Sequence, residues 1–207
     1  MKGHHIEAVF FDFGGVIARL DRDELRRLEE RYGLPQGAVL RSFYGIPEWN
    51  EVEVDRLSEE AWLEAVGGKL DELAGRPIPG IRQEWGRIWG NLDRDVVRLA
   101  ERLKSSYRVG LISNSTKRLE NELLGRNGIR DLFDVVINSA RVGVAKPDPR
   151  IYHLAAEQIG AQPSRCLHID DLQDNVRGAQ AAGFRAIHYR GDYPALEQDL
   201  RSLGVRV

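Results

Sequence analysis

The chain has 207 residues, 42% of them hydrophobic and 30% charged, a balance typical of a globular protein rather than a disordered one. The net charge of −2 gives no reason to expect nucleic acid or an anionic membrane surface as a partner. No apolar run approaches the roughly 20 residues that span a bilayer, and residues 1–7 lack the pattern of a signal peptide, so a cytoplasmic protein is expected. The single cysteine, Cys166, excludes a disulfide within the chain.

The first predicted strand is a short apolar run over residues 8–11. It is followed directly by Asp12 and, after one phenylalanine, by Gly14 and Gly15. Glycines permit a sharp turn and allow backbone amides to approach a ligand closely. Since open α/β sheets bind ligands at the carboxyl ends of their strands, Asp12 is the first candidate site residue.

No strand-like run follows between residues 20 and 91, where the apolar spacing is helical. Helices are predicted over residues 21–32, 36–43, 59–73 and 80–89. Trp85 and Trp89 are expected on a packed face of the last of these. Around a loop expected at residues 45–47, Arg41, Tyr44 and Trp49 could contact a substrate, but packed or solvated side chains are the first expectation. This stretch therefore reads as an all-helical insertion.

From residue 93 onward, helical and strand patterns alternate. Helices are predicted over residues 94–105, 117–126, 149–159, 175–182 and 194–203, and strands over 109–112, 135–137, 166–169 and 185–189. Such alternation predicts a parallel sheet with helices on both faces, a three-layer α/β/α core of Rossmann-like type. The predicted core comprises residues 1–18 and 92–207, and the predicted helical insertion comprises residues 19–91.

Polar clusters follow the predicted strands or lie in the loops between them. They are Asp12, Ser113 with Asn114, Lys146 with Pro147, and Asp170 with Asp171. Because parallel strands end at one edge of the sheet, these groups should converge. Paired carboxylates suit Mg²⁺, and a carboxylate can attack phosphorus while a lysine and a hydroxyl hold the phosphoryl oxygens. His168, inside the strand before the pair, is expected to be a packed residue rather than a metal ligand.

In this order the clusters resemble the four motifs of the haloacid dehalogenase (HAD) superfamily of hydrolases, and the match covers nearly the whole chain. The motif residues are 10–17, 111–114, 146–152, and 169–171 followed by 175–179. The resemblance implies an HAD-like core whose helical cap closes over the site and selects substrates.

The resemblance also implies a role for each site residue. Asp12 would be the nucleophile, Ser113 and the nearby Asn114 amide would hold the transferring phosphoryl group together with Gly14 and Gly15, and Lys146 would neutralise charge. Mg²⁺ would be bound by Asp12, the Gly14 carbonyl and Asp171, with Asp170 as a second or water-mediated ligand.

One position departs from the family pattern. Most phosphatases of the family carry a second aspartate two residues after the nucleophile, as general acid and base, and this chain has Gly14 there. The Gly14 carbonyl can still bind a metal, but the proton donor is missing. General acid catalysis contributes roughly 10²–10⁴-fold, so hydrolysis of ordinary phosphate monoesters should suffer unless a cap residue or water substitutes.

The predicted function is a Mg²⁺-dependent phosphatase that acts on a small phosphorylated metabolite through an aspartyl-phosphate. The alternative is a 2-haloacid dehalogenase, which also lacks the second aspartate and works without metal. The pair Asp170 and Asp171 favours the phosphatase, because adjacent carboxylates repel unless a cation is present. A non-catalytic binding or regulatory protein on the same fold is a third possibility. The sequence leaves open the substrate and the choice between monomer and homodimer.

Overall fold

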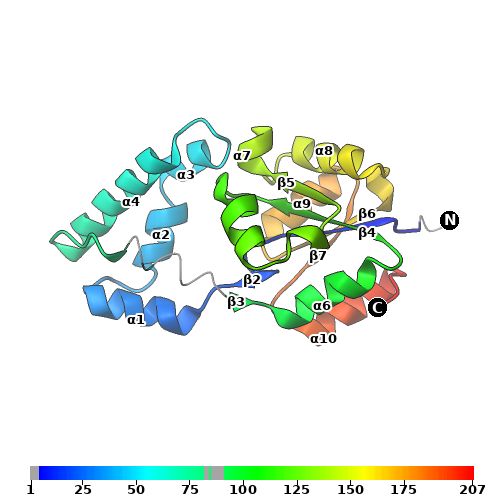
Figure 1. The fold of residues 1–207 in the computed structure, drawn as a ribbon, viewed down its shortest axis with the longest axis horizontal. Coiled ribbons are helices and arrows are strands. Elements are labelled where there is room, and N and C mark those ends of the chain that lie inside the picture. The colour runs from blue at the N-terminus through cyan, green and yellow to red at the C-terminus, as the bar shows by residue number, and fades with distance from the viewer. Residues whose placement is uncertain (1–4, 82–83, 85–90) are drawn as a thin grey trace.

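The computed structural model describes residues 5–81, 84 and 91–207, and a five-stranded parallel sheet forms its centre (Figure 1). The strands are β1 (Ala8–Phe11), β4 (Arg108–Ser113), β5 (Val135–Asn138), β6 (Cys166–Asp170) and β7 (Arg185–His188), in the order β5-β4-β1-β6-β7. The central strand, β1, is buried throughout and pairs with both β4 and β6. Asp12 therefore leaves the sheet at its middle.

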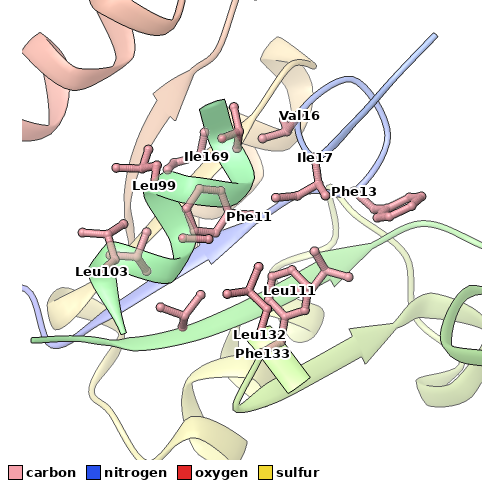
Figure 2. Packing of buried hydrophobic residues seen from close by; sticks show 14 of the residues in the cluster. Phe11, Phe13, Val16, Ile17, Leu99, Leu103, Leu111, Leu132, Phe133 and Ile169 are labelled. Atoms are coloured by element: carbon pink, nitrogen blue, oxygen red, sulfur yellow. The ribbon is translucent and has the colours of Figure 1, made fainter. Parts of the chain in front are cut away.

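Helices cover both faces of this sheet, as the alternating pattern predicts. The helices α6 (Arg94–Leu103) and α10 (Tyr193–Ser202) pack on one face, in a cluster that includes Phe11 (Figure 2). The helices α8 (Pro149–Ile159) and α9 (Gln173–Ala181) cover the other face, where Phe10 is buried. Successive side chains of a strand point to opposite faces, so the apolar run of β1 supplies both layers. The α/β/α core is confirmed.

The inserted residues form a second helical group to one side of the sheet (Figure 1). It contains α1 (Arg22–Tyr32), α2 (Ala38–Tyr44), α3 (Pro47–Val52) and α4 (Glu59–Ala74). These helices share a hydrophobic cluster of their own, in which Trp62 donates a hydrogen bond from Nε1 to the Phe43 carbonyl at 3.1 Å. The insertion is therefore helical, as predicted. The division of the chain into domains at residues 18/19 and 91/92 stays a prediction.

Several helices begin where an aspartate accepts a backbone hydrogen bond from the first turn. Asp21, Asp93, Asp148 and Asp192 do so for α1, α6, α8 and α10. Such caps satisfy amide groups that have no partner within the helix. In α8 the capping Asp148 is followed by Pro149 at the first position of the helix, where proline fits well. Among the described residues, no helix combines the length and the apolar character needed to cross a membrane.

The structure differs from the sequence prediction in a few short elements. The predicted loop at residues 45–47 is wrong at Pro47, which begins α3, because proline suits the first turn of a helix. The strands β2 (Ala18–Arg19) and β3 (Asn91–Leu92) pair antiparallel and are too short to show a periodicity. Part of the helix predicted over residues 117–126 is π-helical, over Leu119–Leu124. Most of the helix predicted over residues 80–89, with Trp85 and Trp89, lies outside the described residues.

Candidate active site

The predicted polar clusters meet at the carboxyl edge of the sheet, with Lys146 between two carboxylates. Its Nζ lies 2.9 Å from Asp12 Oδ1 and 2.6 Å from Asp170 Oδ2, and donates to the Ile112 carbonyl at 3.0 Å. An ammonium group has three protons to donate, so each has an acceptor. The lysine is therefore held rigidly, with its charge against both carboxylates.

At the centre of the site, three carboxylates lie around one ammonium group. Burial opposes the charge of Lys146, but Asp12 and Asp170 outweigh it and hold the pKa of Lys146 above its usual range. Burial also opposes the charge of Asp170, but Lys146 and His168 outweigh it and hold the pKa of Asp170 well below its usual range. At Asp12, burial raises the pKa to about 7, and the charges of Asp170 and Asp171 add to the rise that Lys146 opposes. One ammonium thus does not offset three carboxylates.

Asp170 is fully buried and holds the surrounding side chains in place. Besides Lys146, its Oδ2 lies 2.9 Å from Nε2 of His168, and its Oδ1 accepts hydrogen bonds from the Leu172 amide at 2.9 Å and from Asn175 Nδ2 at 3.0 Å. His168 is buried, as predicted. The many bonds of Asp170 position the lysine and the start of α9.

The loop after β4 positions the loop that carries Lys146. Asn114 donates from Nδ2 to the Lys146 carbonyl at 2.9 Å, and its Oδ1 accepts from the Lys146 amide at 2.8 Å. Ser113, the last residue of β4, is buried beside it. The second and third motifs are therefore joined by two hydrogen bonds between the Asn114 side-chain amide and the Lys146 backbone.

The acidic cluster has the composition of a site for a hard cation. Oxygen atoms of Asp12, Asp170 and Asp171 all lie within 4.8 Å of one another. Gly15 has a φ of +78°, and a Cβ at this position would lie 2.2 Å from Asp171 Oδ2. Only a glycine leaves room for the Asp171 carboxylate there. Closely spaced carboxylate oxygens with excess negative charge fit Mg²⁺, so the residues present fit the metal that the resemblance implies.

Gly15→Ala should displace Asp171 and weaken binding of Mg²⁺, measured as a smaller Mg²⁺-dependent rise in Tm. Gly128→Ala is the matched control, because Gly128 has a φ of +66° but nothing within 4 Å of its Cβ position. Both variants should lose about 1–2 kcal/mol through the left-handed backbone. An unchanged response to Mg²⁺ in Gly15→Ala would show that the glycine is not needed for the carboxylate.

A cleft of about 1220 Å³ opens over the site between the sheet edge and the inserted helices. From the core it is lined by Asp12, Gly14, Gly15, Asn114, Lys146 and Asp171. Arg41, Tyr44 and Trp49 line it from α2 and α3, and Trp49 also packs against the hydrophobic cluster of the inserted helices. The rings of Tyr44 and Trp49 meet edge to face at 4.8 Å between centroids.

One acidic residue near the cleft was missed by sequence reasoning. Glu53 directly follows α3 and is only 8% exposed. Its carboxyl interacts with Asn114, Trp49 and Lys146, all of which line the cleft. Several acidic residues stand between positions 48 and 60, and no spacing or motif separates Glu53 from the others. Only the tertiary fold distinguishes it.

The comparison with known proteins decides the family. A model described as haloacid dehalogenase-like hydrolase matches residues 6–183. The chain belongs to this family of hydrolases. It is 30% identical over 194 residues to a phosphatase of Mycobacterium tuberculosis, an alignment that covers 87% of this chain and 86% of the relative.

Solved structures of two kinds of HAD enzyme share the fold. An HAD family enzyme of Bacteroides thetaiotaomicron, solved as a magnesium complex, matches with a TM-score of 0.71 and 20% identity over 95% of this chain and 100% of that one. The L-2-haloacid dehalogenase of Xanthobacter autotrophicus matches with a TM-score of 0.68 and 23% identity over 95% of this chain and 83% of that one. The fold therefore does not choose between the two reactions.

Proposed function

We propose that this HAD hydrolase is a Mg²⁺-dependent phosphatase that acts on a small phosphorylated metabolite through an aspartyl-phosphate at Asp12. The excess of negative charge carries the proposal, since Asp12, Asp170 and Asp171 cluster around a single ammonium group. A dehalogenase needs one anionic nucleophile. The half-buried Asp171 raises the pKa of Asp12 and so favours its protonated form, which does not serve a dehalogenase. The phosphatase of Mycobacterium tuberculosis among the relatives supports the same reaction.

The proposed metal ligands are Asp12, the Gly14 carbonyl and Asp171. Asp170 is proposed to reach the metal through water, because its own oxygens already accept bonds from Lys146, Asn175 and a backbone amide. When bound, Mg²⁺ would offset the repulsion between an anionic nucleophile and an anionic phosphoryl group. The magnesium complex of the Bacteroides enzyme supports this choice of metal.

The residues of the chain would hold the nucleophile and the phosphoryl group. The Phe13 amide donates to Asp12 Oδ1 at 2.6 Å and Lys146 approaches the same oxygen, which fixes the carboxylate. Asp12 would form a bond to phosphorus as the bond to the leaving oxygen breaks; water would then attack phosphorus and release Asp12 and inorganic phosphate. Ser113, Asn114 and the backbone at Gly14 and Gly15 are proposed to hold the phosphoryl oxygens.

The helical insertion is proposed to act as the cap of this enzyme. In this division residues 19–91 form the cap, and residues 1–18 with 92–207 form the core. Arg41, Tyr44 and Trp49 reach the cleft from the cap, opposite Asp12. They would contact the leaving group, which makes the cap the part that selects the substrate.

The proposed function is tested by two assays run side by side, each with Mg²⁺ and with a chelator. Phosphate release from p-nitrophenyl phosphate should require Mg²⁺, and chloride release from 2-chloropropionate should not occur. Asp171→Asn should lose the Mg²⁺-stimulated rate, while Asp174→Asn, at an exposed side chain of α9, should keep it. Metal-independent chloride release would contradict the proposal and indicate a dehalogenase. Failure of both assays would favour a binding protein.

A further inference from the structure

The first motif of this chain supplies no proton donor for the leaving group, because Gly14 has no side chain. An alkoxide is a poor leaving group, and protonating it is worth roughly 10²–10⁴-fold in rate. If the proposed phosphatase function holds, another group at the cleft must donate this proton. Such a group would be an acid that has no structural role among the described residues around the cleft.

Most titratable groups around the cleft already have partners. Asp21 caps α1 by accepting from the Glu24 amide at 2.9 Å. His188 has its Nε2 2.9 Å from the Asp171 carbonyl, and Asp170 accepts several hydrogen bonds. These groups are held in place by contacts within the fold.

Glu53 is different, because one of its carboxyl oxygens is buried without a partner. Its Oε2 has no hydrogen-bond partner within the described part of the chain, although the residue is only 8% exposed. A buried oxygen left without a hydrogen bond destabilises the protein. A protonated Glu53 carboxyl would remove this destabilisation by donating a hydrogen bond to a hydroxyl or alkoxide oxygen of a ligand.

The surroundings of Glu53 bring it to the reacting end of the cleft. Its carboxyl interacts with Lys146, which contacts Asp12, and with the side-chain amide of Asn114, which follows Ser113. The third partner is Trp49, on the cap side of the cleft. The carboxyl therefore lies beside three residues that line the cleft, two from the core and one from the cap.

Ion pairs between the cap and the core hold this segment in place. Lys117 lies 2.6 Å from Asp55, and Arg118 lies 3.0 Å from Glu59, so the loop after β4 is tied to the residues on both sides of the turn before α4. The Glu53 amide donates to the Trp49 carbonyl at 3.0 Å, which continues α3. The segment that carries Glu53 thus contacts the loop that carries Asn114.

We infer that Glu53 is the general acid and base of this enzyme, supplied by the cap in place of the missing aspartate at position 14. As the bond from phosphorus to the leaving oxygen breaks, the Glu53 proton moves to that oxygen and an alcohol leaves. The Glu53 carboxylate then takes a proton from the water that attacks the phosphorus of the aspartyl-phosphate. Each turnover returns both Glu53 and Asp12 to their starting states.

The protonation of Glu53 suits both halves of this cycle. Burial raises its pKa to about 7, although Lys146, Asn114 and Trp49 favour the charged form. A carboxyl with this pKa is populated in both forms near neutral pH, which is the condition for a group that gives a proton in one step and takes one in the next.

The test compares leaving groups in Glu53→Gln, a variant that keeps the size and the hydrogen-bond acceptor of the side chain. Against propyl phosphate, whose alkoxide needs a proton, kcat should fall by roughly 10²–10⁴-fold. Against p-nitrophenyl phosphate, whose phenolate leaves unaided, kcat should fall by less than about 10-fold, as expected where no proton is needed. Glu51→Gln is the matched control, since Glu51 is about half exposed and paired with Arg56 at 2.8 Å, and it should change neither rate.

A second variant separates catalysis from a structural role. Gly14→Asp in the Glu53→Gln background restores a proton donor at the usual position of the family and should recover much of the rate on propyl phosphate. Recovery would also show that Glu53→Gln folds. Equal losses on both substrates, with no recovery, would overturn the role of Glu53 and leave the phosphatase in place. Absence of Mg²⁺-dependent phosphate release by the wild-type protein itself would overturn the proposed function, and this inference with it.

Discussion

Asp12→Asn should abolish turnover of p-nitrophenyl phosphate, with kcat reduced by roughly 10⁴-fold or more, as when a covalent nucleophile is removed. The amide has no oxygen able to form the covalent intermediate, while its carbonyl can still accept from the Phe13 amide and from Lys146, the two donors to Asp12 Oδ1. The fold should therefore persist. A circular dichroism spectrum and a Tm close to those of the wild type would show that only the chemistry was lost.

The control for this variant is Asp174→Asn, which removes the same charge from an exposed side chain of α9. It should hydrolyse p-nitrophenyl phosphate at the wild-type rate. If Asp12→Asn, freshly purified and free of deamidated protein, kept a tenth or more of the activity, Asp12 would not be the nucleophile.

Lys146→Met should lower the free energy of unfolding by about 3–5 kcal/mol at pH 8. The side chain is buried, and its ammonium lies between Asp12 and Asp170. Methionine fills a similar volume but leaves the two carboxylates buried without their cation. Lys69→Met is the control, since Lys69 forms an exposed pair with Glu72 and pairs of that kind contribute about 0–1 kcal/mol.

The effect of Lys146→Met should be smaller at pH 5 than at pH 8. Burial raises the pKa of Asp12 to about 7 in the folded protein, above the 3.8 of a free aspartate. An acid with a raised folded pKa favours folding at low pH, and this contribution is lost as the pH rises from about 4 to about 7. At pH 5 Asp12 takes up a proton and repels Asp170 less. Urea unfolding at both values would measure this, and a loss of equal size at pH 5 and pH 8 would contradict it.

The sequence predicts the core of the fold because its strands are short apolar runs that end in polar residues. One apolar run ends at Asp12 and another at Asp170. Because these two strands are parallel, both carboxylates lie at the same edge of the sheet. The helix α8 has the predicted bounds, and its start is marked by Asp148 and Pro149. These features depend on residues that are close together in the chain.

Features that depend on distant residues could not be predicted in this way. The pairing of β2 with β3 joins two-residue strands on either side of the insertion, and no local sequence pattern predicts this pairing. Glu53 gains its environment from Asn114 and Lys146, which are more than fifty residues away in the chain. The positions of Arg41 and Trp49 at the cleft likewise depend on how α2 and α3 lie over the sheet edge.

Whether Asp12 carries the phosphoryl group during turnover can be tested by chemical trapping. The wild-type protein would be mixed with p-nitrophenyl phosphate and Mg²⁺, quenched in acid and reduced with borohydride, which converts an aspartyl-phosphate to homoserine. Peptide mass spectrometry should find homoserine at position 12, and only when substrate and Mg²⁺ are both present. Two results would contradict the role of Asp12 as the phosphorylated nucleophile. One is steady phosphate release while Asp12 stays unmodified, under conditions where phosphorylated protein accumulates. The other is phosphate release with the modification on another residue.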